Sequence, residues 1–196
     1  MFRVACVISL LMLAMLAARA RHHHYADDES VLKVGGVQFV IPDSWQARPP
    51  STSDRAGQWT LPPPEDQGDD GVEIVAIFFG PGVGGNAKDN IDAWAGTIAS
   101  SDGSNAPSAP QKRTIAGHAV TEALFVGTYA QASSRPGLPP TAKPGYALLG
   151  AVVENPGGNI YWRVTGPASQ VLALAPVLDR VIGSLKPQPP APASTP

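Results

Sequence analysis

The chain has 196 residues, with 14 Lys or Arg against 16 Asp or Glu, so its formal net charge is −2. This mild acidity, without a basic stripe, excludes the electrostatic footprint of a nucleic-acid-binding protein. A single cysteine excludes a disulfide framework, so the fold must depend on an apolar core.

Residues 1–20 have the order of a signal peptide. Arg3 stands before an apolar run over residues 4–16, and Ala18-Arg19-Ala20 supplies the small residues of a cleavage site. A membrane-spanning helix needs about 20 apolar residues, which is more than this run contains. We therefore expect export with cleavage after Ala20, and a periplasmic or secreted mature protein with no membrane span.

The mature chain is expected to form one domain between two disordered ends. Residues 21–30 are polar and aperiodic, and residues 187–196 form a proline-rich tail that favours an extended polyproline conformation. Residues 31–186 are enough for one apolar core and too few for two ordinary domains.

Short strands are predicted in the first part of this domain. Residues 37–41 are β-prone and stop at a proline, and residues 45–48 and 58–61 also end at prolines, which cannot donate to a strand ladder. Residues 72–79 are almost wholly apolar, which is typical of a strand covered on both faces.

A helix is predicted to follow the glycine-rich turn of residues 80–86 and to end near Ser100. Asn86 is a favourable N-cap for it. The spacing of one buried helical stripe is shown by Ile91, Trp94, Ala95 and Ile98.

The second half is predicted to be an antiparallel meander followed by a helix. Its strands cover residues 112–115, 118–129, 146–154 and 159–165, with a flexible excursion over residues 130–145. The small residues Gly150 and Ala151 leave room for a helix to pack closely. The last helix is expected to begin at Pro167 and to kink or break near Ala175, because Pro176 lacks a backbone N–H.

This order of elements predicts an α+β fold, an antiparallel sheet with helices packed on it. A family resemblance is carried by Phe78-Phe79-Gly80-Pro81-Gly82-Val83-Gly84-Gly85-Asn86 with Asn90 and Trp94, and by Leu149-Gly150-Ala151, Thr165-Gly166-Pro167 and Ser184-Leu185-Lys186. These residues resemble exported bacterial proteins of unassigned function with the PsbP-like α/β/α sandwich, which the photosystem II extrinsic subunit PsbP shares with the Ran-binding protein Mog. The resemblance covers residues 31–186 and implies a non-catalytic accessory role, but it carries no site residue.

The glycine-rich turn is the first candidate ligand site. Backbone N–H groups before a helix can hold a phosphate or a carboxylate, which makes Gly82, Gly84, Gly85 and Asn86 candidate binding residues. The turn lacks both the G-K-[ST] ending and the G-x-G-x-x-G spacing of nucleotide-binding loops. A tight connection from strand to helix is the simpler interpretation.

Catalysis has one candidate residue in the mature domain. His118 is the only histidine outside the N-terminal cluster, and neither a G-x-S-x-G motif nor a cysteine accompanies it. Glu122 and Glu154 could lie near each other on adjacent strands, without the opposed placement that a glycosidase needs. No enzyme activity and no cofactor are therefore expected, and a hydrolase using His118 is the weaker alternative.

Cleavage after Ala20 would also create a candidate metal site. The new terminus would begin Arg21-His22-His23, and its amine, two amides and the His23 imidazole could form a planar set of four nitrogens. Such a set favours Cu(II) or Ni(II). The alternative is a disordered tail whose histidines bind metal weakly.

The function that the sequence favours is an extracytoplasmic, non-catalytic binding or accessory domain. It would act through contacts with an unknown protein partner, along a sheet edge or through residues 130–145. The alternative is a carrier of a small anionic ligand that uses the turn of residues 80–86.

Export can be tested by mass spectrometry of the protein recovered from its native host. We expect a chain that begins at Arg21, because the small residues before it match the specificity of signal cleavage. A recovered chain that still begins at Met1 would contradict the predicted signal peptide.

Overall fold

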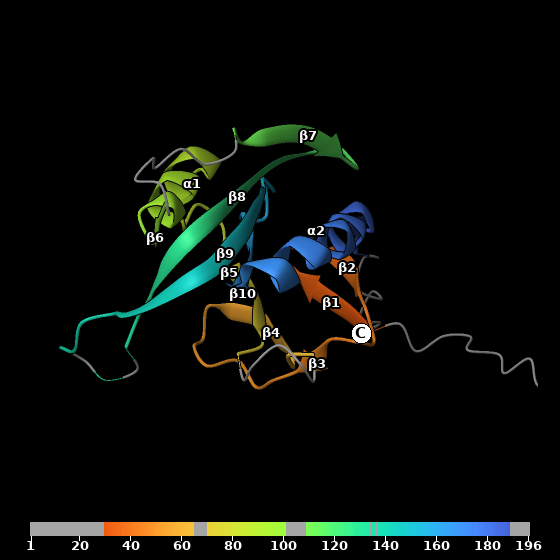
Figure 1. The fold of residues 1–196 in the computed structure, drawn as a ribbon. Coiled ribbons are helices and arrows are strands. Elements are labelled where there is room, and N and C mark those ends of the chain that lie inside the picture. Colours follow the sequence, from red (N-terminus) through yellow and green to blue (C-terminus); the bar gives the residue numbers. More distant parts are fainter. Residues whose placement is uncertain (1–29, 65–69, 101–108, 134, 136, 189–196) are drawn as a thin grey trace, which may run out of the picture.

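A computed structural model of the chain describes residues 30–64, 70–100, 109–133, 135 and 137–188. The expected signal peptide and the N-terminal histidines lie outside these residues. The framework is an eight-stranded antiparallel sheet in the order β3-β4-β5-β10-β9-β8-β6, with β7 paired to β8 (Figure 1). Its strands are β3 (Gln46–Ala47), β4 (Arg55–Leu61), β5 (Val72–Phe78), β6 (Ile98–Ala99), β7 (Gln111–Ile115), β8 (His118–Gln131), β9 (Thr141–Val153) and β10 (Ile160–Pro167).

Two layers cover the sheet. Helix α2 (Ala168–Gly183) packs on β9 and β10 together with a small second sheet of β1 (Ser30–Val34), β2 (Val37–Ile41) and β11 (Lys186–Pro187). Helix α1 (Ala87–Ala95) lies against β6, β8 and β9 on the other face (Figure 1). The predicted α+β fold is therefore confirmed, and the sheet is its middle layer.

The larger core lies between the main sheet and α2, and aromatic side chains fill its centre. Trp162 is fully buried and stacks on Trp59, with ring centroids 6.0 Å apart. Phe39 of the small sheet meets Trp162 edge-on at 5.3 Å, and Trp45 packs against both tryptophans. Offset and edge-on pairs of this kind add to the free energy of burial.

A second, smaller core lies under α1. Ile91 and Trp94 are buried there against Leu148 and Val152 of β9. Trp94 lies directly over Gly150, where an added Cβ would come within 2.3 Å of the indole ring. The predicted close approach of a helix at Gly150 is therefore confirmed, and only glycine permits it.

Helix α1 is shorter than predicted. It ends at Ala95, where the Thr97 hydroxyl donates to the carbonyl of Trp94 at 2.7 Å. Ile98 is buried as expected, but in β6, where it pairs with Tyr129. Thr97 and Ile98 are both β-branched, which favours a strand. Pairing with β8 therefore stabilises a strand at Ile98 in place of another helical turn.

Helix α2 begins at Ala168 and continues through Pro176, so the chain does not break near Ala175, and a kink there stays a prediction. Pro176 has no N–H to donate to the carbonyl of Leu172, a residue on the exposed side of the helix. Burial of Val171, Leu178, Val181 and Ile182 against the sheet offsets the cost of about 3 kcal/mol that a proline imposes on a helix.

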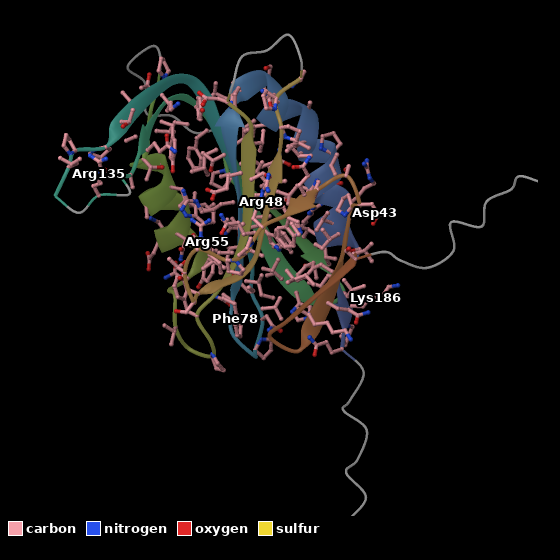
Figure 2. The ribbon with its side chains drawn as sticks, turned by 90° about the horizontal axis from the view of Figure 1, so that it is seen from below. Asp43, Arg48, Arg55, Phe78, Arg135 and Lys186 are labelled. Atoms are coloured by element: carbon pink, nitrogen blue, oxygen red, sulfur yellow. The ribbon has the colours of Figure 1, made fainter. Side chains whose placement is uncertain are left out.

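The expected excursion of residues 130–145 is also shorter than predicted, because β8 extends to Gln131 and β9 begins at Thr141. Arg135 lies in the loop between these strands, on the opposite side of the molecule from Lys186 (Figure 2). Near Lys186, Pro187 pairs with Val37 of β2, so the sheet includes a residue that the sequence placed in the tail.

Trp94→Ala is expected to destabilise the domain strongly. Truncation of a buried tryptophan typically costs about 3–5 kcal/mol, a large part of the stability of an ordinary domain. Urea unfolding measures the loss, and Lys88→Ala on the exposed side of α1 is the control. An unchanged unfolding midpoint for Trp94→Ala would show that this contact does not hold the helix.

Gly150→Ala should destabilise the domain only while Trp94 is present. The new methyl group would collide with the indole, and such overpacking typically costs about 1–3 kcal/mol. In the Trp94→Ala background the space is empty, so a double-mutant cycle should show coupling between the two residues. Additive free energies of unfolding would contradict the close contact.

Candidate functional site

Helix α1 covers only part of its face of the sheet, and a polar cavity of about 470 Å³ lies on the remainder. The cavity is formed by the ends of β8 and β10, the beginning of β9, and the beginning of β5 with the residues before it. Among the residues that line it are Arg55, Asp70, Glu73, Tyr129, Lys143, Tyr146, Arg163 and Thr165. Two β-bulges, one in β4 and one in β9, bring charged residues onto this face of the sheet.

The first bulge is in β4. Arg55 pairs with Ile77 and Gly57 with Ala76, so β4 uses two residues where β5 uses one. Because of the extra residue, Arg55 and Gln58 lie on the same face although they are three positions apart. Both side chains reach Glu73 of β5 from there.

The second bulge is in β9. Gly127 pairs with Tyr146 and Tyr129 with Lys143, so β9 uses three residues where β8 uses two. Gly145 provides the positive φ of +72° that the bulge requires. Lys143 and Tyr146 therefore both face the cavity, again at a spacing of three.

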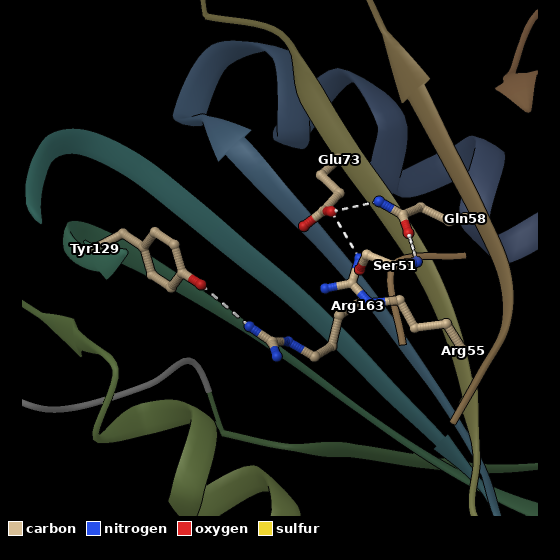
Figure 3. A network of polar contacts seen from close by, with 6 residues as sticks. All are labelled: Ser51, Arg55, Gln58, Glu73, Tyr129 and Arg163. Carbon is tan, nitrogen blue, oxygen red and sulfur yellow. Dashed lines mark hydrogen bonds and ion pairs between the residues drawn. The ribbon is translucent and has the colours of Figure 1, made fainter. Parts of the chain in front are cut away.

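Glu73 is held by two donors from β4 (Figure 3). Arg55 donates to its Oε1 at 2.7 Å and Gln58 donates to the same oxygen at 3.0 Å. Glu73 Oε2 receives no hydrogen bond from any residue that the structure describes. One carboxylate oxygen is thus occupied, while the other is an unused acceptor on a residue that lines the cavity.

Asp70 is held in a similar way on the other side. Lys143 donates to its two oxygens at 2.9 and 3.2 Å, and the hydrogen bonds from Lys143 and Tyr146 lower the pKa of Asp70. Burial, with the hydrogen bond to Asp70, raises the pKa of Tyr146 to about 12. The Tyr146 hydroxyl is therefore protonated at neutral pH, and Asp70 is ionised and paired.

Arg163 is the one cation of the cavity that forms no ion pair with a described residue. Its Nη2 donates to the Tyr129 hydroxyl at 3.2 Å (Figure 3), and its Nε is buried without an acceptor in the described chain. Arg55 and Lys143 are matched by Glu73 and Asp70, so Arg163 leaves the lining with one net positive charge. The Arg163 side chain is partly buried, with its Nε excluded from solvent, and an anion would supply the acceptor that this atom lacks.

The glycine-rich turn is organised mainly by its carbonyl groups. Asn90 donates to the carbonyl of Gly84 at 2.8 Å, and Tyr161 donates to that of Gly85 at 2.8 Å. Asn86 caps α1 as predicted, since its Oδ1 accepts from the backbone of Asp89. A ligand site at Gly82, Gly84, Gly85 and Asn86 stays a prediction.

The candidate catalytic residues are not brought into one site. His118 Nδ1 lies 3.1 Å from the carbonyl of Glu154. Glu122 is opposite Ala151 in the register, whereas Glu154 bonds to Ala119, so the two acids lie at different levels of the sheet. Burial raises the pKa of Glu122, which accepts a hydrogen bond from Arg113 at 3.1 Å.

The described residues also bear on metal binding and on membrane-spanning helices. Within the described ranges, no three His, Cys, Asp or Glu side chains lie close enough together to hold a metal ion. The copper or nickel site at Arg21, His22 and His23 lies outside these ranges and stays a prediction. Neither α1 nor α2 has the length and apolar character that crossing a bilayer requires.

No protein-family model and no curated protein matches the chain. Among solved structures it is similar to a PsbP of the cyanobacterium Synechocystis, with 12% identity and a TM-score of 0.49 over 84% of this chain and 91% of that one. It is also similar to LpqN of Mycobacterium tuberculosis, described as involved in cell envelope biogenesis, with 17% identity and a TM-score of 0.47 over 84% and 88%.

A third similar structure is a protein of unknown function from Pseudomonas aeruginosa, described as a putative regulator. It has 14% identity and a TM-score of 0.45 over 82% of this chain and 97% of that one. A PsbP is thus among the structures that this chain is similar to, as the sequence resemblance predicts. At these identities and TM-scores, the likeness extends to nothing beyond the fold.

Proposed function

We propose that this chain is a non-catalytic binding domain that works outside the cytoplasm and holds a small carboxylate in the cavity at Arg163. The observation that carries the proposal is the unpaired guanidinium of Arg163 among groups that are otherwise paired. A guanidinium presents a planar fork of donors that matches a carboxylate. A monoanion would bring the net charge of the lining to zero.

The arrangement supports recognition more than reaction. Glu73 and Asp70 each accept hydrogen bonds from a cation, so neither is placed as a free general base. The cavity volume of about 470 Å³ is within the range of small-molecule sites. The expected protein contact through residues 130–145 or a sheet edge stays a separate prediction, which a pull-down from the exported fraction would test.

Arg163→Met should weaken carboxylate binding without loss of stability. The substitution keeps an apolar stem and removes a partly buried charge that has no carboxylate partner among the described residues, so we expect an equal or higher melting temperature. Loss of a hydrogen bond to a charged group should weaken binding about tenfold or more. Titration of the labelled protein with a panel of small monocarboxylates, followed by NMR chemical shifts, measures this.

Arg135→Met is the matched control, because it removes the same charge from the loop between β8 and β9, at a residue that is not among those lining the cavity. Gly82→Ala tests the competing site, since Gly82 has a φ of +72° and a side chain there would strain the turn. The proposal is wrong if no carboxylate of the panel binds, or if Arg163→Met binds as the unmodified protein does. Binding that is lost only in Gly82→Ala would move the ligand to residues 80–86.

A further inference from the structure

The cavity also has features that select among carboxylates. We infer that its ligand is a hydroxylated monocarboxylate, such as a sugar acid or another polyhydroxy acid, whose carboxylate lies at Arg163 and whose hydroxyl groups donate to Glu73. This inference rests on the proposed function and adds the chemical class of the ligand. It depends on the charge of the lining and on the hydrogen-bonding groups that remain unused.

The charge of the lining favours a ligand with a single negative charge. Arg55 with Glu73 and Lys143 with Asp70 form two neutral pairs, at 2.7 and 2.9 Å, which leaves the charge of Arg163. A monoanion neutralises that charge. An α-amino acid zwitterion would leave it in place, and a dianion would add a negative charge among groups already paired.

The free acceptor of the cavity favours a hydroxyl donor on that ligand. Oε1 of Glu73 accepts from both Arg55 and Gln58, while Oε2 accepts from no described residue (Figure 3). An ionised carboxylate is an acceptor only, so the group that satisfies Oε2 must be a donor. A hydroxyl supplies that donor and adds no charge.

The hydroxyl groups of the protein offer the complementary donors. Tyr129 already accepts from Arg163 at 3.2 Å, so its own proton is available to a ligand oxygen. The Thr165 side chain also lines the cavity and makes no hydrogen bond to another described residue. A ligand with several hydroxyl groups can use the acceptor and these donors at once, whereas an aliphatic acid of the same size would displace water from them and return no hydrogen bond.

The test compares matched ligands by isothermal titration calorimetry. D-Glucuronate and cyclohexanecarboxylate share a six-membered ring and one carboxylate, and gluconate and hexanoate form the open-chain pair. We expect each hydroxylated acid to bind at least about tenfold more tightly than its partner, because a site built for a hydroxyl discriminates against an analogue without it. Methyl glucoside, which lacks the carboxylate, should not bind measurably, and alanine should bind more weakly than either hydroxylated acid.

A double variant separates the acceptor from the charge. Arg55→Met with Glu73→Met removes one whole ion pair, so the net charge of the lining is unchanged while the acceptor is lost. We expect this variant to show a clearly smaller preference for the hydroxylated member of each pair, with only the donors of Tyr129 and Thr165 left to favour it. Arg55→Met alone keeps Glu73 and should keep the preference for the hydroxylated acid.

The outcomes distinguish the two proposals. If no acid of either pair binds, the carboxylate site at Arg163 is wrong, and the inference fails with it. If acids bind but the hydroxylated member is not preferred in either pair, or if alanine binds more tightly, the carboxylate site stands and this inference is overturned. A preference that is undiminished in the double variant would also overturn the role of Glu73.

Discussion

The burial of Trp162 is the constraint on which the rest of this structure depends. β10 lies between β5 and β9 at the centre of the sheet, and Trp162 is the side chain around which Phe39, Trp45 and Trp59 gather. Because successive side chains of a strand point to opposite faces, the burial of Trp162 toward α2 directs Arg163 to the face of α1. The same side chain that organises the larger core therefore positions the charge of the cavity.

The layer on that second face is incomplete, and its incompleteness makes a site possible. α1 has nine residues, and Trp94 fixes it over Gly150, which is opposite Arg163 in the register of β9 and β10. The helix therefore covers the sheet up to the level of Arg163 and no further. Beyond it the sheet carries polar side chains held in pairs, as an uncovered sheet face requires.

Alternation and turn signals predicted most of the strands, because each buried strand of this sheet carries a local signal. The strand at residues 37–41 and the hairpin that joins residues 146–154 to 159–165 are clear cases, and the structure confirms both. The end of α1 was missed because the pairing of Ile98 with Tyr129 is a long-range contact that no local spacing contains. The continuity of α2 through Pro176 likewise depends on burial against a distant sheet.

The sequence does not predict the cavity for a different reason, which is the register of the strands that form it. Under strict alternation, Arg55 and Gln58 would point to opposite faces, and so would Lys143 and Tyr146. Each bulge adds one residue, so the side chains of each pair come to lie on the same face. The only local indication of a bulge in the sequence is one glycine, Gly57 in β4 and Gly145 in β9. The chain has 20 glycines, so a single glycine in a strand does not predict a bulge. The glycine-rich turn of residues 80–86 is a stronger local signal for a ligand site than either bulge.

The second bulge also divides β8 and β9 into two parts with different support. Before it, β9 pairs with both β8 and β10, but beyond it β9 pairs with β8 alone, in an arm where Ala130 pairs with Ala142 and Gln131 with Thr141. The Lys143 contact with Asp70 and the Arg163 contact with Tyr129 tie the base of this arm to the body. The backbone amides of the arm should therefore exchange with solvent sooner than those of the central strands, and a molecule held at its base would act as a brace that slows this exchange.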